Sequence, residues 1–158
     1  MMTNFNKYSL GATSAIITSL ALIAGMTHGD NNRLNLIAGL LIIAVADNIT
    51  DSLSIHILKE AEGVTRRQVL ASTIGNFSSR LILTLSFVLI VMCFPSYPAL
   101  VISIAWGTIL LIVLSYSISI KRNTHPYREI AWHLLIALLV IACSRVLGDL
   151  IVKNITAA

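Results

Sequence analysis

Two aspartates and an asparagine lie in the middle of an apolar stretch that is long enough to cross a bilayer. The stretch covers residues 34–58, and the polar residues are Asp47, Asn48 and Asp51. A carboxylate at the centre of a membrane helix costs roughly 2.5–3.5 kcal/mol on insertion scales, unless it has a partner or lines a wet cavity. Because Asp47 and Asp51 are four residues apart, they share one face of a helix. We therefore expect the function of the chain to lie at this position.

Carboxylate and amide oxygens at this spacing are hard ligands, which suit Mg²⁺, Mn²⁺ or Fe²⁺ better than softer metals. The same carboxylates are also able to relay protons. We predict that Asp47 and Asp51 are metal ligands and that Asn48 and Ser14 add auxiliary oxygen ligands. No residue pattern indicates a bound cofactor or matches an enzyme motif, so we expect a transported ion and no catalysed reaction.

Three further charged residues, Arg80, Arg145 and Asp149, lie inside apolar stretches. At the rise of an α-helix, Asp51 lies about 10 Å above the end of its helix and Arg80 about 16 Å above the start of the next. These depths predict an ion pair between Arg80 and Asp51, or between Arg80 and Asp47. Arg145 and Asp149 are four residues apart and are expected to pair with each other. Asp47 is then the carboxylate most available to a substrate.

A structural interpretation of the same charges remains open at this stage. A core of paired aspartates and arginines can fix helix packing and specify a dimer without any transport. His56 continues a stripe formed by Asn48 and Ser52 at four-residue spacing. It lies near the end of its apolar stretch, so we expect it to be an ordinary interfacial residue.

Composition decides the class of protein. Of the 158 residues, 56% are hydrophobic and 11% are charged, and the mean hydropathy is +0.86. Soluble domains carry about 25% charged residues, so we expect an integral membrane protein without a soluble domain. The net charge of +4 then reflects basic loops and does not indicate nucleic-acid binding. Cys93 and Cys143 lie in apolar runs and lack the spacing of metal ligands.

Five apolar segments have about the 20 residues that a membrane-spanning helix needs. The chain is therefore predicted to be one all-α transmembrane domain over residues 1–158. The predicted spans cover residues 8–27, 34–58, 69–94, 98–120 and 129–152. Gly and Asn residues predict a turn at 28–33, two prolines predict a tight turn at Pro95–Pro98, and Pro126 suits the first turn of the last helix.

Basic residues predict the orientation, because they favour cytoplasmic loops. The first and third connections contain only Arg33, whereas the second and fourth contain six basic residues. These six are Lys59, Arg66, Arg67, Lys121, Arg122 and Arg128. The N-terminus is therefore expected in the cytoplasm and the C-terminus outside.

The segments Gly11–Met26 and Ile43–Gly63 resemble the first two helices of the vacuolar iron transporter family. The frame of the family's first-helix motif and its polar second-helix run are kept at Gly11, Ile16, Leu22, Ala24, Gly25 and Asp51–Ser54. The resemblance implies a homodimer of five-helix protomers that exports Fe²⁺ or Mn²⁺ from the cytosol in exchange for protons, along a path between the two protomers.

The sequence also departs from that family. Ser14 stands where the family has a first-helix aspartate, the second span has no methionine, and residues 59–68 replace the cytoplasmic metal-binding insert of some members. The prediction is a short, divergent transporter of a divalent cation in a bacterial cytoplasmic membrane. The alternatives are a proton-coupled carrier of a small organic or anionic solute, with Arg80 or Arg145 as the anion site, and a non-transporting scaffold subunit.

The predicted orientation can be tested by cysteine labelling in a variant in which Cys93 and Cys143 are replaced by alanine. A cysteine at Asn123 should be shielded from an impermeant thiol reagent applied outside intact cells, because the fourth connection is rich in basic residues. A cysteine at Ala157 should react with it. The opposite labelling pattern would refute this orientation.

Overall fold

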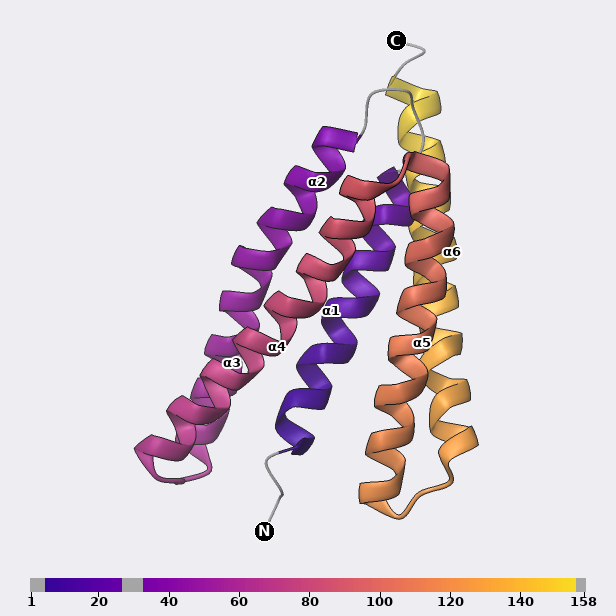
Figure 1. Cartoon of the computed structure of the whole chain (residues 1–158). Coiled ribbons are helices and arrows are strands. Elements are labelled where there is room, and N and C mark those ends of the chain that lie inside the picture. Colours follow the sequence, from indigo (N-terminus) through magenta and orange to yellow (C-terminus); the bar gives the residue numbers. More distant parts are fainter. Residues whose placement is uncertain (1–4, 27–32, 156–158) are drawn as a thin grey trace.

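The computed structural model describes residues 5–26 and 33–155, and these form a bundle of helices (Figure 1). No strand occurs among the described residues. In chain order the elements are α1 (Phe5–Met26), α2 (Arg33–Ile42), the π-helical turn η1 (Ile43–Asp47), α3 (Asn48–Ala61), α4 (Arg66–Cys93), α5 (Ser96–Arg122) and α6 (Pro126–Ile155). The elements α2, η1 and α3 follow one another without a break and make one long rod.

Four helical stretches are long and apolar enough to cross a membrane. They cover residues 33–61, 66–93, 96–122 and 126–154. The fifth, α1, is also apolar, and its stretch Gly11–Met26 is shorter. Most of the surface of α6 is exposed leucine, isoleucine and valine, which is a surface suited to lipid. Each of the five predicted spans therefore corresponds to a helical rod, as expected of an integral membrane protein.

Several helices extend past the predicted spans, because caps and not hydropathy decide where a helix ends. α4 begins at Arg66 since Thr65 and Gln68 form a capping box, in which each side chain bonds the backbone of the other residue. α5 begins at Ser96, directly after Pro95, so the tight turn is shorter than predicted. α6 begins at Pro126, and the prediction for that residue is confirmed.

Two connections turn at residues with positive φ. Gly63 has φ 68° in the connection between α3 and α4, and Asn123 has φ 53° at the end of α5. Glycine and asparagine are the residues that adopt this left-handed conformation most readily. Both connections lie at the same end of the bundle as the start of α1, and α6 ends at the opposite end (Figure 1). The predicted turn at residues 28–32 lies outside the described residues.

The helix α1 lies at the centre of the packing and contacts α2, α4, α5 and α6. Its apolar side chains Ile16, Leu20 and Ile23 are buried. Glycine permits its closest approach to α6: a Cβ atom on Gly148 would lie 2.0 Å from the carbonyl oxygen of Gly25. These two backbones can be this close only because neither residue has a side chain.

Arg33, predicted to lie in a loop, is the first residue of α2. Its Nε donates a hydrogen bond to the carbonyl oxygen of Val91 at 3.0 Å, and its Nη2 donates to that of Met92. These carbonyls belong to the last turn of α4, where the helix itself supplies no donor. The side chain of Arg33 therefore links the start of α2 to the end of α4 through these hydrogen bonds.

Replacing Gly148 by alanine should lower the melting temperature in detergent, because the added Cβ meets backbone and α1 and α6 must separate. Overpacking of this kind costs about 1–3 kcal/mol. Gly39→Ala is the matched control, since its Cβ would meet only the flexible end of Leu22 at 3.0 Å and alanine favours a helix by about 1 kcal/mol. Equal melting of the two variants would contradict the close contact between α1 and α6.

Candidate functional site

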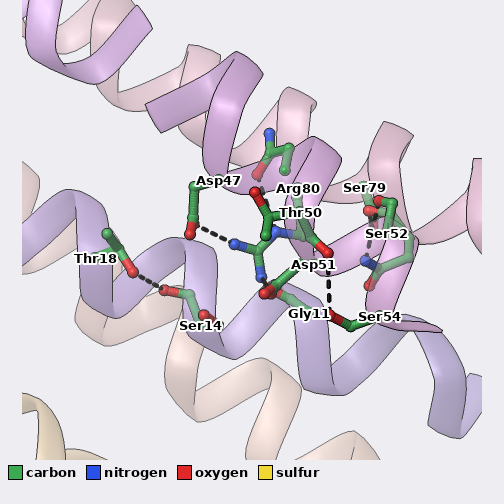
Figure 2. Close-up of polar contacts among 12 residues, drawn as sticks. Gly11, Ser14, Thr18, Asp47, Thr50, Asp51, Ser52, Ser54, Ser79 and Arg80 are labelled. Carbon is green, nitrogen blue, oxygen red and sulfur yellow. Dashed lines mark hydrogen bonds and ion pairs between the residues drawn. The ribbon is translucent and has the colours of Figure 1, made fainter. Parts of the chain in front are cut away.

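The guanidinium of Arg80, in the middle of α4, is fully buried and binds groups on two other rods. Its Nε donates to Oδ1 of Asn48 at 2.9 Å, and its Nη1 donates to the carbonyl oxygen of Gly11 at 3.0 Å. Nη1 also pairs with Asp51, and Nη2 pairs with Asp47 (Figure 2). Four of the five N–H groups of the guanidinium therefore have partners, and α1, α3 and α4 are joined at one point.

An ion pair was predicted between Arg80 and either Asp51 or Asp47 of the second span. The structure contains both ion pairs. The sequence argument assigned one carboxylate to Arg80 and left Asp47 for a substrate. In the structure Arg80 pairs with both, because the two Nη atoms of one guanidinium diverge enough to reach two carboxylates one helical turn apart. Asp47 and Asp51 thus share one counter-ion.

Asp47 is the last residue of the π-helical turn η1, and Asp51 lies one turn further on, in α3. The backbone N–H of Asn48 bonds the carbonyl of Val45, and the side-chain Nδ2 of Asn48 donates to the carbonyl of Ala44 at 2.7 Å. The side chain of Asn48 therefore bonds a backbone carbonyl within η1. Isolated π turns within α-helices occur frequently at functional sites. This one places Asn48 so that its amide bonds the helix at one end and Arg80 at the other.

Glycine at position 11 allows α1 to approach the arginine. A Cβ atom there would lie 1.9 Å from Oδ1 of Asn76 and 3.2 Å from Cδ of Arg80. Any larger residue would push α1 away and remove its carbonyl oxygen from Nη1. Gly11 is therefore part of the site through its backbone.

The outer side of the carboxylates is open. The side chains of Asp47 and Asp51 are 39% and 40% exposed, although Arg80 is 0% exposed. The two contacts with Arg80 use Oδ2 of each aspartate. Exposed hydroxyl groups occur on the same turns of these helices, and those of Thr50 and Ser54 donate to backbone carbonyls of their own helix. The carboxylates thus present oxygen atoms to a partly polar surface.

The predicted metal ligands form only part of a metal site. Asn48 belongs to the cluster, but Arg80 occupies its oxygen and Ala44 its amide nitrogen. Ser14 is exposed one turn after Gly11, and its carbonyl accepts a hydrogen bond from Thr18 at 2.8 Å (Figure 2). Across the described residues, no group of three or more His, Cys, Asp or Glu side chains is placed to hold a metal ion. A hard cation here would need water or further oxygen ligands to complete its shell.

Arg145 and Asp149 do not belong to this cluster. They lie on α6, which packs against α1 and α5. The pairing of Arg145 with Asp149 stays a prediction.

The sequence argument also missed the polar residues of α4 that face α3. Asn76 donates to Oγ of Ser52 at 3.3 Å, and the Oγ1 atom of Thr73 lies 3.1 Å from Nδ1 of His56. On α4 the polar residues Thr73, Asn76 and Arg80 recur every three or four residues. This spacing is a signal that matches the stripe found on α3.

Comparisons of the chain with protein families, with curated proteins and with solved structures gave no match. The resemblance to vacuolar iron transporters therefore rests on residues of the first two helices alone. The ion that this resemblance implies stays a prediction.

Replacing Arg80 by alanine should destabilise the bundle, because two half-buried carboxylates and the buried amide of Asn48 lose their donor. The cost should be below the value of about 3–5 kcal/mol that is typical of fully buried ion pairs, because solvent screens the open sides of the carboxylates. The triple change Arg80→Ala, Asp47→Asn, Asp51→Asn should recover part of the loss, since no unpaired charge remains. Melting curves in detergent measure both effects, and identical curves for the single and triple variants would contradict the charge pairing.

Proposed function

We propose that the protein is a membrane transporter that carries a cation, with Asp47 and Asp51 as the ion-binding carboxylates and Arg80 as their permanent counter-ion. The observation that carries this proposal is the charge of the cluster. Two ionised carboxylates and one guanidinium leave a net charge of −1 on groups that contact one another. In an apolar environment such an imbalance is costly, and binding one positive charge removes it.

The exposure of the carboxylates supports transport over a purely structural role. One aspartate would neutralise Arg80, so the second is not required for packing. Both carboxylates are open on the side away from Arg80, whereas ionised groups are not stable against lipid. An aqueous cavity or a second copy of the chain on this side would solve that problem. The homodimer implied by the resemblance is such an arrangement, and we include it in the proposal.

Charge arithmetic favours the proton as the coupling ion. One proton on Asp47 or Asp51 brings the cluster to zero, whereas a divalent cation with Arg80 in place brings it to +1. A proton and a divalent cation therefore compete for the same oxygens, and this competition is a physical basis for exchange. We propose export of Fe²⁺ or Mn²⁺ from the cytosol against protons, with the cargo assigned from the resemblance and from the hardness of the oxygen ligands.

A second candidate is a scaffold that transports nothing. It is favoured by the contacts of Arg80, which join α1, α3 and α4 and leave a single N–H of the guanidinium without a described partner. In that case the whole cluster serves helix packing. The two candidates differ in what happens when a carboxylate loses its charge but keeps its shape.

Asp47→Asn should abolish cation transport and leave the melting temperature at or above that of the wild type, because the cluster becomes neutral with Arg80 still paired to Asp51. Transport is measured as Mn²⁺ flux and accompanying proton flux in proteoliposomes. Glu129→Gln is the matched control, since it makes the same chemical change at the start of α6 and should transport normally.

Two results would decide against the transporter. Full activity of Asp47→Asn would remove this carboxylate from the ion path. A wild-type protein that moves no ion from a panel of monovalent and divalent cations would favour the scaffold.

A further inference from the structure

Exposed tyrosines lie near both ends of α5. Tyr97 follows the start of the helix and Tyr116 precedes its last turns, and both side chains are exposed. At the rise of an α-helix they are about 28 Å apart, which is close to the roughly 30 Å of the hydrocarbon core of a bilayer. Because tyrosine and tryptophan are enriched at the two interfaces of a membrane, Tyr97 and Tyr116 give the depths of these interfaces along α5.

Basic residues lie directly beyond Tyr116, at the turn between α5 and α6. Lys121 and Arg122 end α5, Arg128 lies in the first turn of α6, and all three are exposed. At the rise of an α-helix, Arg122 lies about 9 Å beyond Tyr116. Arg128 lies about 6 Å before Trp132, which is exposed on α6. The headgroup layer is about 5–8 Å thick on each side of the membrane and arginine side chains can reach back into it, so both arginines lie at the depth of lipid headgroups.

The turn between α5 and α6 is short and is held by backbone hydrogen bonds. The N–H of Thr124 donates to the carbonyl of Ser119 at 3.1 Å, and that of Arg128 donates to the carbonyl of His125 at 3.2 Å. Since α5 and α6 pack against each other, their basic ends stay together. Residues 121–132 contain one acid, Glu129, which is half-buried. Positive charge therefore dominates the exposed surface of this turn.

The connection between α3 and α4 lies at the same end of the bundle (Figure 1) but has a different composition. Lys59 is buried and pairs with Glu62, and the exposed Glu60 adds a second acid. Arg66 and Arg67 are exposed, yet the two acids nearly balance the positive charge of this connection. Residues 53–72 contain no Phe, Trp or Tyr. The α5–α6 connection thus combines an excess of basic residues with interfacial aromatic residues, and the α3–α4 connection does not.

We infer that the exposed basic residues of the α5–α6 connection bind the headgroup of an anionic phospholipid. The binding residues are Lys121, Arg122 and Arg128, with the exposed Tyr127 and Trp132 beside the glycerol region of the lipid. Arginine forms paired hydrogen bonds to phosphate oxygens, and clusters of basic residues next to a membrane helix favour anionic lipids. A zwitterionic headgroup carries its own cation, which such a cluster repels. By the distribution of basic residues, the lipid belongs to the cytoplasmic leaflet.

This site is separate from the carboxylate cluster, and the inference does not depend on the proposed transport. Its test uses Trp132 as a local reporter in vesicles of phosphatidylcholine. The chain has two tryptophans, so Trp106→Phe leaves Trp132 alone, and lipids with brominated acyl chains quench its fluorescence on contact. Brominated phosphatidylglycerol should quench it more than brominated phosphatidylcholine at the same mole fraction. Arg122→Gln together with Arg128→Gln should lower this preference by about tenfold or more, because each basic residue near the surface contributes about fivefold.

Arg66→Gln together with Arg67→Gln is the matched control, since it removes two exposed arginines from the other connection at the same end of the bundle. It should keep the preference for phosphatidylglycerol. Arg122→Lys together with Arg128→Lys should also keep most of it, because the charge remains. Retention in the lysine variant ties the loss in the glutamine variant to charge and not to misfolding.

Three results would overturn the lipid site. The first is equal quenching by the two brominated lipids when all arginines are present. The second is an equal loss in the Arg66 and Arg67 variant, which would assign the preference to general surface charge. The third is loss of the preference in inorganic phosphate but not in chloride at the same ionic strength, which would assign the site to free phosphate. All three are read from Trp132 fluorescence, so they are independent of the ion flux that tests the proposed function.

Discussion

A guanidinium buried among apolar helices has to be surrounded by acceptors, and this requirement organises one half of the bundle. Arg80 has no exposed surface, and an unpaired charge in such a place costs several kcal/mol. Each neighbouring element is shaped to supply an acceptor. α1 supplies a carbonyl because residue 11 is glycine, and the rod of α2, η1 and α3 supplies two carboxylates and an amide at and directly after its π turn. The acidic groups in the second span are thus explained first as partners of Arg80.

The same requirement separates the transport proposal from simple packing. A buried cation is neutralised by one anion, yet two carboxylates contact Arg80 and both keep open surface. The excess negative charge is the property that a packing role does not need. It also limits the chemistry, because Oδ2 of each aspartate is already bonded to Arg80 and the two side chains alone cannot enclose a bare metal ion. A metal cargo therefore depends on water or on oxygen ligands from a second protomer.

The sequence was sufficient to predict features that depend on hydropathy averaged over many residues. Runs of about 20 apolar residues located all five rods, and matching depths on neighbouring antiparallel spans brought Arg80 to Asp47 and Asp51. Features that depend on the geometry of a single helical turn could not be predicted from the sequence. The π turn at Ile43–Asp47 has no sequence signature, and the use of the Gly11 carbonyl depends on how closely two helices pack.

Arginines fix the rod of α2, η1 and α3 to α4 at two places: Arg33 at the end of α4 and Arg80 in its middle. The number of residues between these two places is therefore not free. Adding or removing one residue would rotate everything beyond it by about 100° around the helix axis, and other side chains would face Arg80. During evolution this segment can accept substitutions, but changes of length belong in the connections at 62–65 and 123–125.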